Sequence, residues 1–222
     1  MDTEQLKNEP QPWEFRTKPA WQRLLVMAGG VLFNFILAIT VYTILLAGWG
    51  EKYIPNEGNA VYVNNLAYEM GFRNGDMILS FDEYIPENFA MLQADLARQS
   101  SRKATVLRDS DTLDIYIDHS MIGQVLQSPG MFDLALPFII SEVPESSLNH
   151  GQDIIAGDKI IGINGKEVRF VQDSRQILRA HSGDSVSLAI VRAEDTLVRN
   201  VQVDTSGLIG VMLRQPEIKS KE

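Results

Sequence analysis

The longest uncharged stretch of the chain, from Leu24 to Gly50, limits what this sequence can be. No Asp, Glu, Lys or Arg occurs anywhere within it. About 20 predominantly apolar residues are enough to cross a bilayer as a helix. A buried helix of a soluble protein is the alternative, but such a helix is seldom apolar on every face over this length. We therefore predict a transmembrane helix over residues 24–50.

The basic residues around this run predict its orientation. Arg16, Lys18 and Arg23 lie just before it, whereas Lys52 is the one basic residue soon after it. Because Lys and Arg are enriched in the cytoplasmic flanks of membrane helices, residues 1–23 are predicted to be a cytoplasmic arm. The chain would then sit in the inner (cytoplasmic) membrane, with the segment after the helix in the periplasm or another extracytoplasmic space.

Three residues of the apolar run share one helix face. Gly30, Asn34 and Ala38 stand at i, i+4 and i+8, which places them one above the other on a helix. Small residues beside an amide suit close packing and hydrogen bonding between membrane helices. The alternative is a helix that tolerates one polar residue. No second apolar run follows, so the packing interpretation requires helices from another chain or from a part of the gene product outside this sequence.

The composition argues against nucleic-acid binding, cysteine chemistry and metal binding by histidine. The net charge of −9 argues against nucleic acid, which requires clustered Lys and Arg. The chain has no cysteine, and its three histidines, His119, His150 and His181, share no ligand spacing. We therefore predict no catalytic residue and no metal ligand in this chain.

Two later stretches resemble each other. "MGFRNGDMILSFDEYIPENF" spans residues 70–89, and "IIAGDKIIGINGKEVRF" spans residues 154–170. Gly75-Asp76 aligns with Gly157-Asp158. The two pairs lie much farther apart than the about 20–50 residues of a solenoid unit, so the spacing favours two tandem domains. Glycine permits a positive φ in the turn, and aspartate can fix the turn by bonding its backbone.

Each copy continues with a helical pattern and two strands. The predicted strands are Lys103–Leu107, Leu113–Ile117, Val186–Val191 and Val198–Val203. Each copy closes on a similar tail, "SMIGQVL" at residue 120 and "GLIGVML" at residue 207. The predicted fold class is α+β: a transmembrane helix followed by two tandem small β-barrel or sandwich domains with helices. The expected boundaries are an arm at 1–23, the membrane helix at 24–50, domains at 51–130 and 131–216, and a tail, or the start of a further segment, at 217–222.

The Gly-Asp core, the turn before it and the glycine-containing closing strand resemble a bacterial PDZ domain. PDZ domains bind an extended peptide along a sheet edge and capture its terminal carboxylate in a backbone nest. The resemblance implies that the closing segments line two peptide-binding grooves. The alternative is that their glycines only form turns before a core strand. The first groove is the weaker candidate, because Ser120 stands where the second copy has Gly207. The implied residues are Leu208, Ile209, Gly210 and Val211 with Ile177 on the facing helix in the second groove, and Met121, Ile122, Gly123 and Gln124 in the first.

The order of these parts also resembles one family. Lys18, Arg23, Ala28-Gly29 and Asn34, followed by tandem PDZ-like domains, resemble the start of the second membrane helix of RseP-type site-2 proteases. These are bacterial intramembrane zinc metalloproteases. The zinc ligands of that family come from His-Glu-x-x-His and from an acidic residue in a Leu-Asp-Gly-type motif, and neither motif occurs in this sequence. The resemblance therefore implies the central piece of such a protease, with zinc in the parent family and no cofactor in this chain.

Two functions follow as hypotheses. The first is the substrate-gating and peptide-recognition part of an intramembrane zinc protease of regulated intramembrane proteolysis, with anti-sigma-factor-type substrates and no activity in this chain alone. Its partners would be a membrane-protein substrate or a peptide C-terminus, and the other membrane helices of the protease. The alternative is a non-catalytic, membrane-anchored tandem-PDZ adaptor that binds extracytoplasmic peptides.

Overall fold

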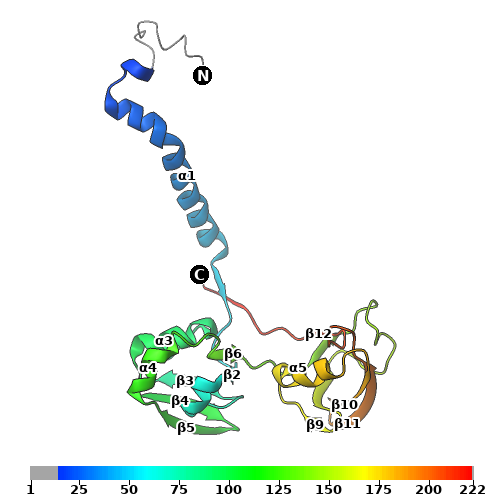
Figure 1. Ribbon diagram of the computed structural model, residues 1–222. Coiled ribbons are helices and arrows are strands. Elements are labelled where there is room, and N and C mark those ends of the chain that lie inside the picture. Colours follow the sequence, from blue (N-terminus) through cyan, green and yellow to red (C-terminus); the bar gives the residue numbers. More distant parts are fainter. Residues whose placement is uncertain (1–14, 222) are drawn as a thin grey trace. The chain divides into compact units, whose positions relative to one another are not determined.

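The computed structural model describes residues 15–221 and divides them into two compact units (Figure 1). The first unit contains the N-terminal part through Lys52 together with the last residues of the chain. The second unit spans Tyr53–Lys219. The predicted arm is thus described from Phe15 onwards, and the part of it before Phe15 lies outside the described residues.

The first unit is dominated by one long helix. A short 3-10 turn, η2 (Phe15–Thr17), precedes α1 (Ala20–Trp49). The helix begins after Pro19, whose fixed φ suits a helix start, and ends at Gly50 with a φ of 65°. It therefore starts slightly before the predicted span. Its 30 residues correspond to about 45 Å at about 1.5 Å per residue, more than a hydrocarbon core of about 30 Å.

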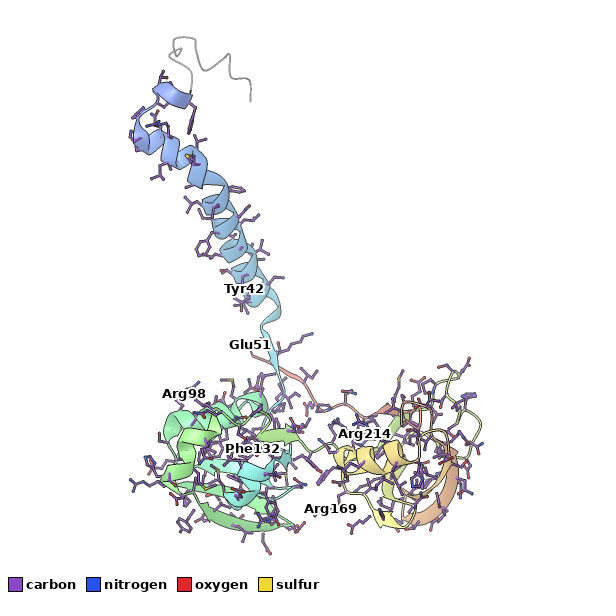
Figure 2. The ribbon with its side chains drawn as sticks, viewed as in Figure 1. Tyr42, Glu51, Arg98, Phe132, Arg169 and Arg214 are labelled. Carbon is purple, nitrogen blue, oxygen red and sulfur yellow. The ribbon has the colours of Figure 1, made fainter. Side chains whose placement is uncertain are left out.

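The apolar side chains of α1 are exposed within the described structure. They project outward along the helix, as Tyr42 does (Figure 2). Thr40 and Thr43 satisfy their hydroxyls by donating to the carbonyls of Ile36 and Ile39 at 2.8 Å, a bond that lets a helix carry Thr on an apolar face. Of the helices in residues 15–221, α1 alone has the length and composition to cross a membrane.

The second unit has two hydrophobic cores, one in each half. The first half (residues 53–136) packs around Phe72, Phe81, Leu92 and Leu96, which are fully buried. Its sheets are β3-β4-β5 and β2-β6, all antiparallel. Its elements are β2 (Val61–Val63), α2 (Asn65–Glu69), β3 (Met77–Phe81), η3 (Phe89–Met91), α3 (Leu92–Gln99), β4 (Lys103–Arg108), β5 (Asp111–Tyr116), α4 (His119–Val125) and β6 (Phe132–Leu134).

The second half (residues 137–219) repeats this plan around Ile160, Leu188 and Ile190. Its sheets have the orders β11-β10-β8-β9 and β12-β7. Its elements are β7 (Ile140–Glu142), β8 (Lys159–Ile163), β9 (Lys166–Glu167), α5 (Val171–Ala180), β10 (Ser185–Arg192), β11 (Asp195–Gln202) and β12 (Met212–Leu213). Two flanking strands, β1 (Glu51–Tyr53) and β13 (Lys219–Lys221), pair with each other.

The four predicted strands and the helix before each pair are confirmed. They form β4 with β5 and β10 with β11, in continuous antiparallel register. Alternate residues of β10 are buried, which is the pattern of a strand with one face on a core. The helices α3 and α5 bury residues in the same places. Under the alignment of the two Gly-Asp pairs, Leu92 and Leu96 correspond to Ser174 and Leu178, and all four are buried.

An ion pair between a fully buried aspartate and a partly exposed arginine holds the Gly-Asp turn in each half. Asp76 is fully buried, accepts the N–H of Arg73 and pairs with Arg108 at 2.7 and 2.8 Å. Asp158 likewise accepts the N–H of Ile155 and pairs with Arg192 at 2.8 and 3.0 Å. The predicted role of the aspartates in fixing the turns is confirmed. The two arginines are additions that the sequence analysis did not identify.

The ion pairs also change proton affinities. Burial alone would raise the pKa of the Asp158 carboxyl, but hydrogen bonds from Arg192 and from the N–H of Ile155 bring it below its ordinary value. The hydrogen bonds from Arg192 to Asp158 and Asp153 raise the pKa of Arg192. Hydrogen bonding to Asp76 raises the pKa of Arg108 in the first half. The Asp158 carboxylate therefore stays ionised although it is buried.

The prediction for the closing segment of the first half was wrong. Residues 120–125 form most of α4, a helix that begins where the Asp118 side chain accepts the N–H of Ser120. The structural counterpart of the tail at residue 207 is the loop before β6, because β6 pairs with β2 as β12 pairs with β7. The glycines before these two strands, Gly130 and Gly210, also have matching φ values of 64° and 65°. The similarity of the two Ile-Gly tails was therefore a local coincidence, and α4 is inserted between β5 and that loop.

Candidate peptide-binding groove

A groove runs along α5 in the second half of the Tyr53–Lys219 unit. Its cavity volume of about 390 Å³ lies in the range of ligand sites, which is about 300–1,000 Å³. The helix forms one wall, and the segment before and within β12 forms the other. The lining residues are Phe138, Val171, Ser174, Arg175, Leu178, Arg179, Ser206, Gly207, Leu208, Ile209, Gly210, Val211 and Leu213.

The wall on α5 follows helical periodicity. Val171, Ser174 and Leu178 recur every three or four residues, so they share the face that looks into the groove. Leu178 and Ser174 are almost fully buried at the base of that face. Ile177, which the resemblance implied for this wall, is outside the lining and packs against the second core instead.

The opposite wall contains all four residues predicted on the closing segment, Leu208, Ile209, Gly210 and Val211. Leu208 is 60% exposed and Ile209 only 3%, so successive side chains alternate between solvent and core. Gly210 has a positive φ, and a Cβ there would lie 2.7 Å from the Oγ of Ser147. Only glycine fits this position without displacing Ser147.

The side chain of Asn149 fixes the position of this wall through hydrogen bonds to its backbone. Its side chain is 1% exposed, and its Nδ2 donates to the carbonyls of Gln202 at 2.8 Å and Ile209 at 2.9 Å. Its Oδ1 accepts the N–H of Gln202 at 2.7 Å. One buried amide thus ties the groove segment to β11, and such fully satisfied polar groups fix a unique backbone position.

A tight turn leads into the groove segment. The Asp204 carboxylate accepts hydrogen bonds from the Ser206 hydroxyl and N–H and from the N–H of Leu208. The hydrogen bond from the Ser206 hydroxyl is the main reason that the pKa of Asp204 lies below its ordinary value. Gly207 closes the turn with a φ of 80°, and a Cβ there would touch the Arg179 stem at 3.0 Å.

The backbone N–H groups that follow this turn are free to bind a ligand. In the described part of the chain, the N–H groups of Ile209 and Gly210 donate no hydrogen bond. Strand β12 pairs with β7 alone among the described strands, which leaves its other edge unpaired. Free amides beside an unpaired strand edge are what a PDZ groove offers to a peptide and its terminal carboxylate.

The equivalent position in the first half is filled by its own chain. Gln93 of α3 donates to the carbonyls of Val125 and Ser128, and its Oε1 accepts the N–H of Met131. The helices α3 and α4 lie side by side (Figure 1). Pro129, which precedes Gly130 as Ile209 precedes Gly210, has no N–H to donate.

The residues implied for the first groove therefore have other surroundings. Ile122 is 9% exposed and belongs to the first core, and Gly123 is a helical residue of α4. Met121 packs against the same core, and Gln124 lies in the same helix. All four belong to a helix rather than to a loop whose amides could bind a carboxylate.

The membrane-helix face lies apart from the groove, on α1. Gly30, Asn34 and Ala38 share its surface, and a Cβ added at Gly30 would meet nothing within 4 Å. No hydrogen bond to the Asn34 side chain occurs within residues 15–221. The described residues also contain no group of His, Cys, Asp or Glu that could hold a metal ion.

Among the residues of the groove and its support that were not identified from the sequence, two arginines and one asparagine matter most. Arg175 and Arg179 line the groove from α5, and Asn149 supports it from the turn before the Gly-Asp motif. The arginines could have been found, because they follow Ser174 and Leu178 on the groove face once the helix is placed. Asn149 gave no such signal, since its partners are 53 and 60 residues away.

Comparison with known proteins identifies the class. The model of peptidase family M50 matches residues 2–220. The metalloprotease MmpA of Caulobacter vibrioides is 31% identical over 103 residues, which cover 46% of this chain and 26% of that protein. The regulator of sigma-W protease RasP of Bacillus subtilis is 28% identical over 121 residues, covering 53% of this chain and 28% of that protein.

Solved structures give a weaker match. The PDZ domain of an SdrC-like protein from Listeria monocytogenes aligns with 35% of this chain and 86% of its own, at a TM-score of 0.31 and 19% identity. An HtrA-type protease, AlgW, solved with a decapeptide, aligns with 76% of this chain and 60% of its own, at a TM-score of 0.25 and 14% identity.

The family match covers nearly the whole chain, including the long apolar helix. The class is therefore that of the site-2 metalloproteases, and the chain belongs to peptidase family M50. It spans only about a quarter of the length of the two relatives named.

Proposed function

We propose that this chain is the substrate-gating, peptide-reading part of an intramembrane zinc metalloprotease. The groove beside α5 carries the proposal, because it combines a cavity, free backbone amides and an unpaired strand edge. The groove would receive the C-terminal end of a membrane-protein substrate, such as an anti-sigma factor after a first cut. Peptide recognition falls to the second half, since Gln93 bonds to the corresponding loop of the first half and Pro129 has no N–H at the position of Ile209.

The membrane helix would complete the protease core. Helices outside this sequence would pack on Gly30, Asn34 and Ala38 and would carry the zinc ligands, and the Asn34 amide would hydrogen-bond across that contact. The positive-inside rule supports a cytoplasmic N-terminus and extracytoplasmic PDZ-like domains in the inner membrane. The proposed domains keep the order expected from the sequence (51–130 and 131–216), but their boundary moves to residues 136–137, because Met131 and β6 belong to the first core and sheet.

Blocking the groove tests the peptide-reading role. We expect a dye-labelled decapeptide with a free C-terminal valine to bind the full chain in neutral detergent micelles, measured by fluorescence anisotropy. Val171→Trp should weaken binding at least about 10-fold, or about 1.4 kcal/mol, because the larger ring fills one end of the groove. Val171 is preferable to Gly210, whose replacement would also displace Ser147.

Val198→Trp is the matched control. It makes the same change on β11 in the same half, at a residue 62% exposed and outside the groove lining. Its affinity should equal that of the wild type. A wild-type chain that binds no peptide with a free apolar C-terminus would contradict peptide reading and leave only a steric filter.

A further inference from the structure

We propose that the second groove selects peptides with an acidic side chain two residues before an apolar C-terminus. This inference rests on the proposed peptide-reading function and names the ligand class of the same site. Its basis is the pair of arginines on the groove face of α5, Arg175 and Arg179.

Both guanidinium groups are free to meet a ligand. Arg175 and Arg179 are exposed, and neither forms an ion pair or a side-chain hydrogen bond within residues 15–221. The nearest acid along the helix, Asp173, is engaged elsewhere. Its carboxylate accepts the Tyr62 hydroxyl and caps α5 by accepting the N–H groups of Arg169 and Phe170. Two unpaired positive charges in a chain of net charge −9 create a local site for an anion.

The position of Arg179 assigns it to the terminal carboxylate of the ligand. The backbone and stem of Arg179 lie beside Gly207, so Arg179 stands at the end of the groove where the amides of Ile209 and Gly210 are free. The Asp204 carboxylate lies in the same turn, but the hydroxyl and amides of the turn already satisfy it. The terminal carboxylate of the ligand would be the second carboxylate at this end of the groove, and Arg179 supplies the positive charge that it requires.

Arg175 stands one turn closer to the start of α5. Four helical residues rise about 6 Å, and two residues of an extended peptide cover about 6.6 Å. Alternate side chains of a strand share a face, so a peptide whose last side chain enters the apolar groove also turns its third-last side chain toward α5. Arg175 therefore faces that third-last side chain.

The first half provides an internal contrast. Under the alignment of the two Gly-Asp pairs, Gln93 and Ala97 stand where the second half has Arg175 and Arg179. Gln93 is bonded to its own chain, and Ala97 is uncharged. The positive pair is thus particular to the half whose groove is open.

Two peptides that differ only in one charge test the inference. Decapeptides ending in Glu-Ala-Val and Gln-Ala-Val, each with a free C-terminus, are titrated against the full chain in neutral detergent micelles. The Glu peptide should bind about 5-fold more tightly at low salt, the upper range for an exposed charge pair. The difference should shrink at about 0.5 M salt because the charges are then screened. Arg175→Gln should abolish it, whereas Arg102→Gln, at another exposed arginine, should leave it unchanged.

Arg179→Gln should weaken both peptides by the same factor, because both carry the terminal carboxylate. Equal wild-type affinity for the two peptides would overturn the acidic selectivity while peptide reading stands. Selectivity that survives Arg175→Gln would also overturn the assignment. If neither peptide binds, the proposed function fails and this inference fails with it.

Discussion

Replacing Arg192 by Met is expected to lower the free energy of unfolding of the second half by about 1.5–3 kcal/mol, less than for a pair buried on both sides because the Arg192 side chain is 27% exposed. The substitution leaves the Asp158 carboxylate fully buried with only the Ile155 N–H as a partner. Removing one member of a buried ion pair costs this much because the remaining charge has lost its solvation and its counter-ion. Hydrogen exchange of the β10 amides, such as that of Ile190, measures the loss in this half of the full chain.

Arg199→Met is the matched control for this change. Arg199 pairs with Asp153, which is 57% exposed, so the expected loss is below about 1 kcal/mol. In the wild type, the protection of the β10 amides from hydrogen exchange should also decrease as the pH is lowered. The folded-state pKa of Asp158 is depressed, so its stabilisation is present above about pH 4 and is lost as pH drops through the folded value. Equal exchange in Arg192→Met and Arg199→Met would contradict the role of the buried pair.

Asn149→Ala should weaken peptide binding at least about 10-fold and destabilise the second half by at least about 3 kcal/mol. Three backbone groups, the carbonyls of Gln202 and Ile209 and the N–H of Gln202, lose their partner. Each unsatisfied buried group costs about 1–3 kcal/mol, and the Ile209 segment loses its anchor. Anisotropy titration gives the affinity, and β10 exchange gives the stability.

Asn200→Ala is the matched control, because it removes an asparagine side chain from the same half without removing a hydrogen bond. Asn200 is exposed on β11 and makes no side-chain hydrogen bond within the described residues. It should match the wild type in both measurements. Unchanged peptide affinity in Asn149→Ala, at a temperature where β10 stays protected, would show that Asn149 does not position the groove.

Much of the fold was predictable because its signals are local or repeated. The uncharged run indicated α1, and alternation in residues 103–117 and 186–203 indicated the two hairpins. The Gly-Asp repeat located both turns. Even the missed arginines repeat, since Arg108 and Arg192 both open an Arg-x-x-Asp-Thr-Leu pattern in the sequence.

The failures came where a short pattern had two solutions. "SMIGQVL" is compatible with a strand or a helix, and Asp118 together with burial of Ile122 and Val125 on the first core favoured the helix. Ile177 is next to Leu178 along α5, yet one helical step rotates a side chain by about 100° and moves it off the groove face. Neither choice could be made before the helices were placed on their sheets.

The most direct test of the central claim is the coding DNA read in frame on both sides of this sequence. If the chain is the middle of an intramembrane zinc protease, an apolar segment with His-Glu-x-x-His should precede Met1, and a further apolar segment with an acidic ligand should follow Glu222. A ribosome-binding site directly before Met1 and a stop codon after Glu222 would contradict the claim and leave an anchored peptide-binding adaptor.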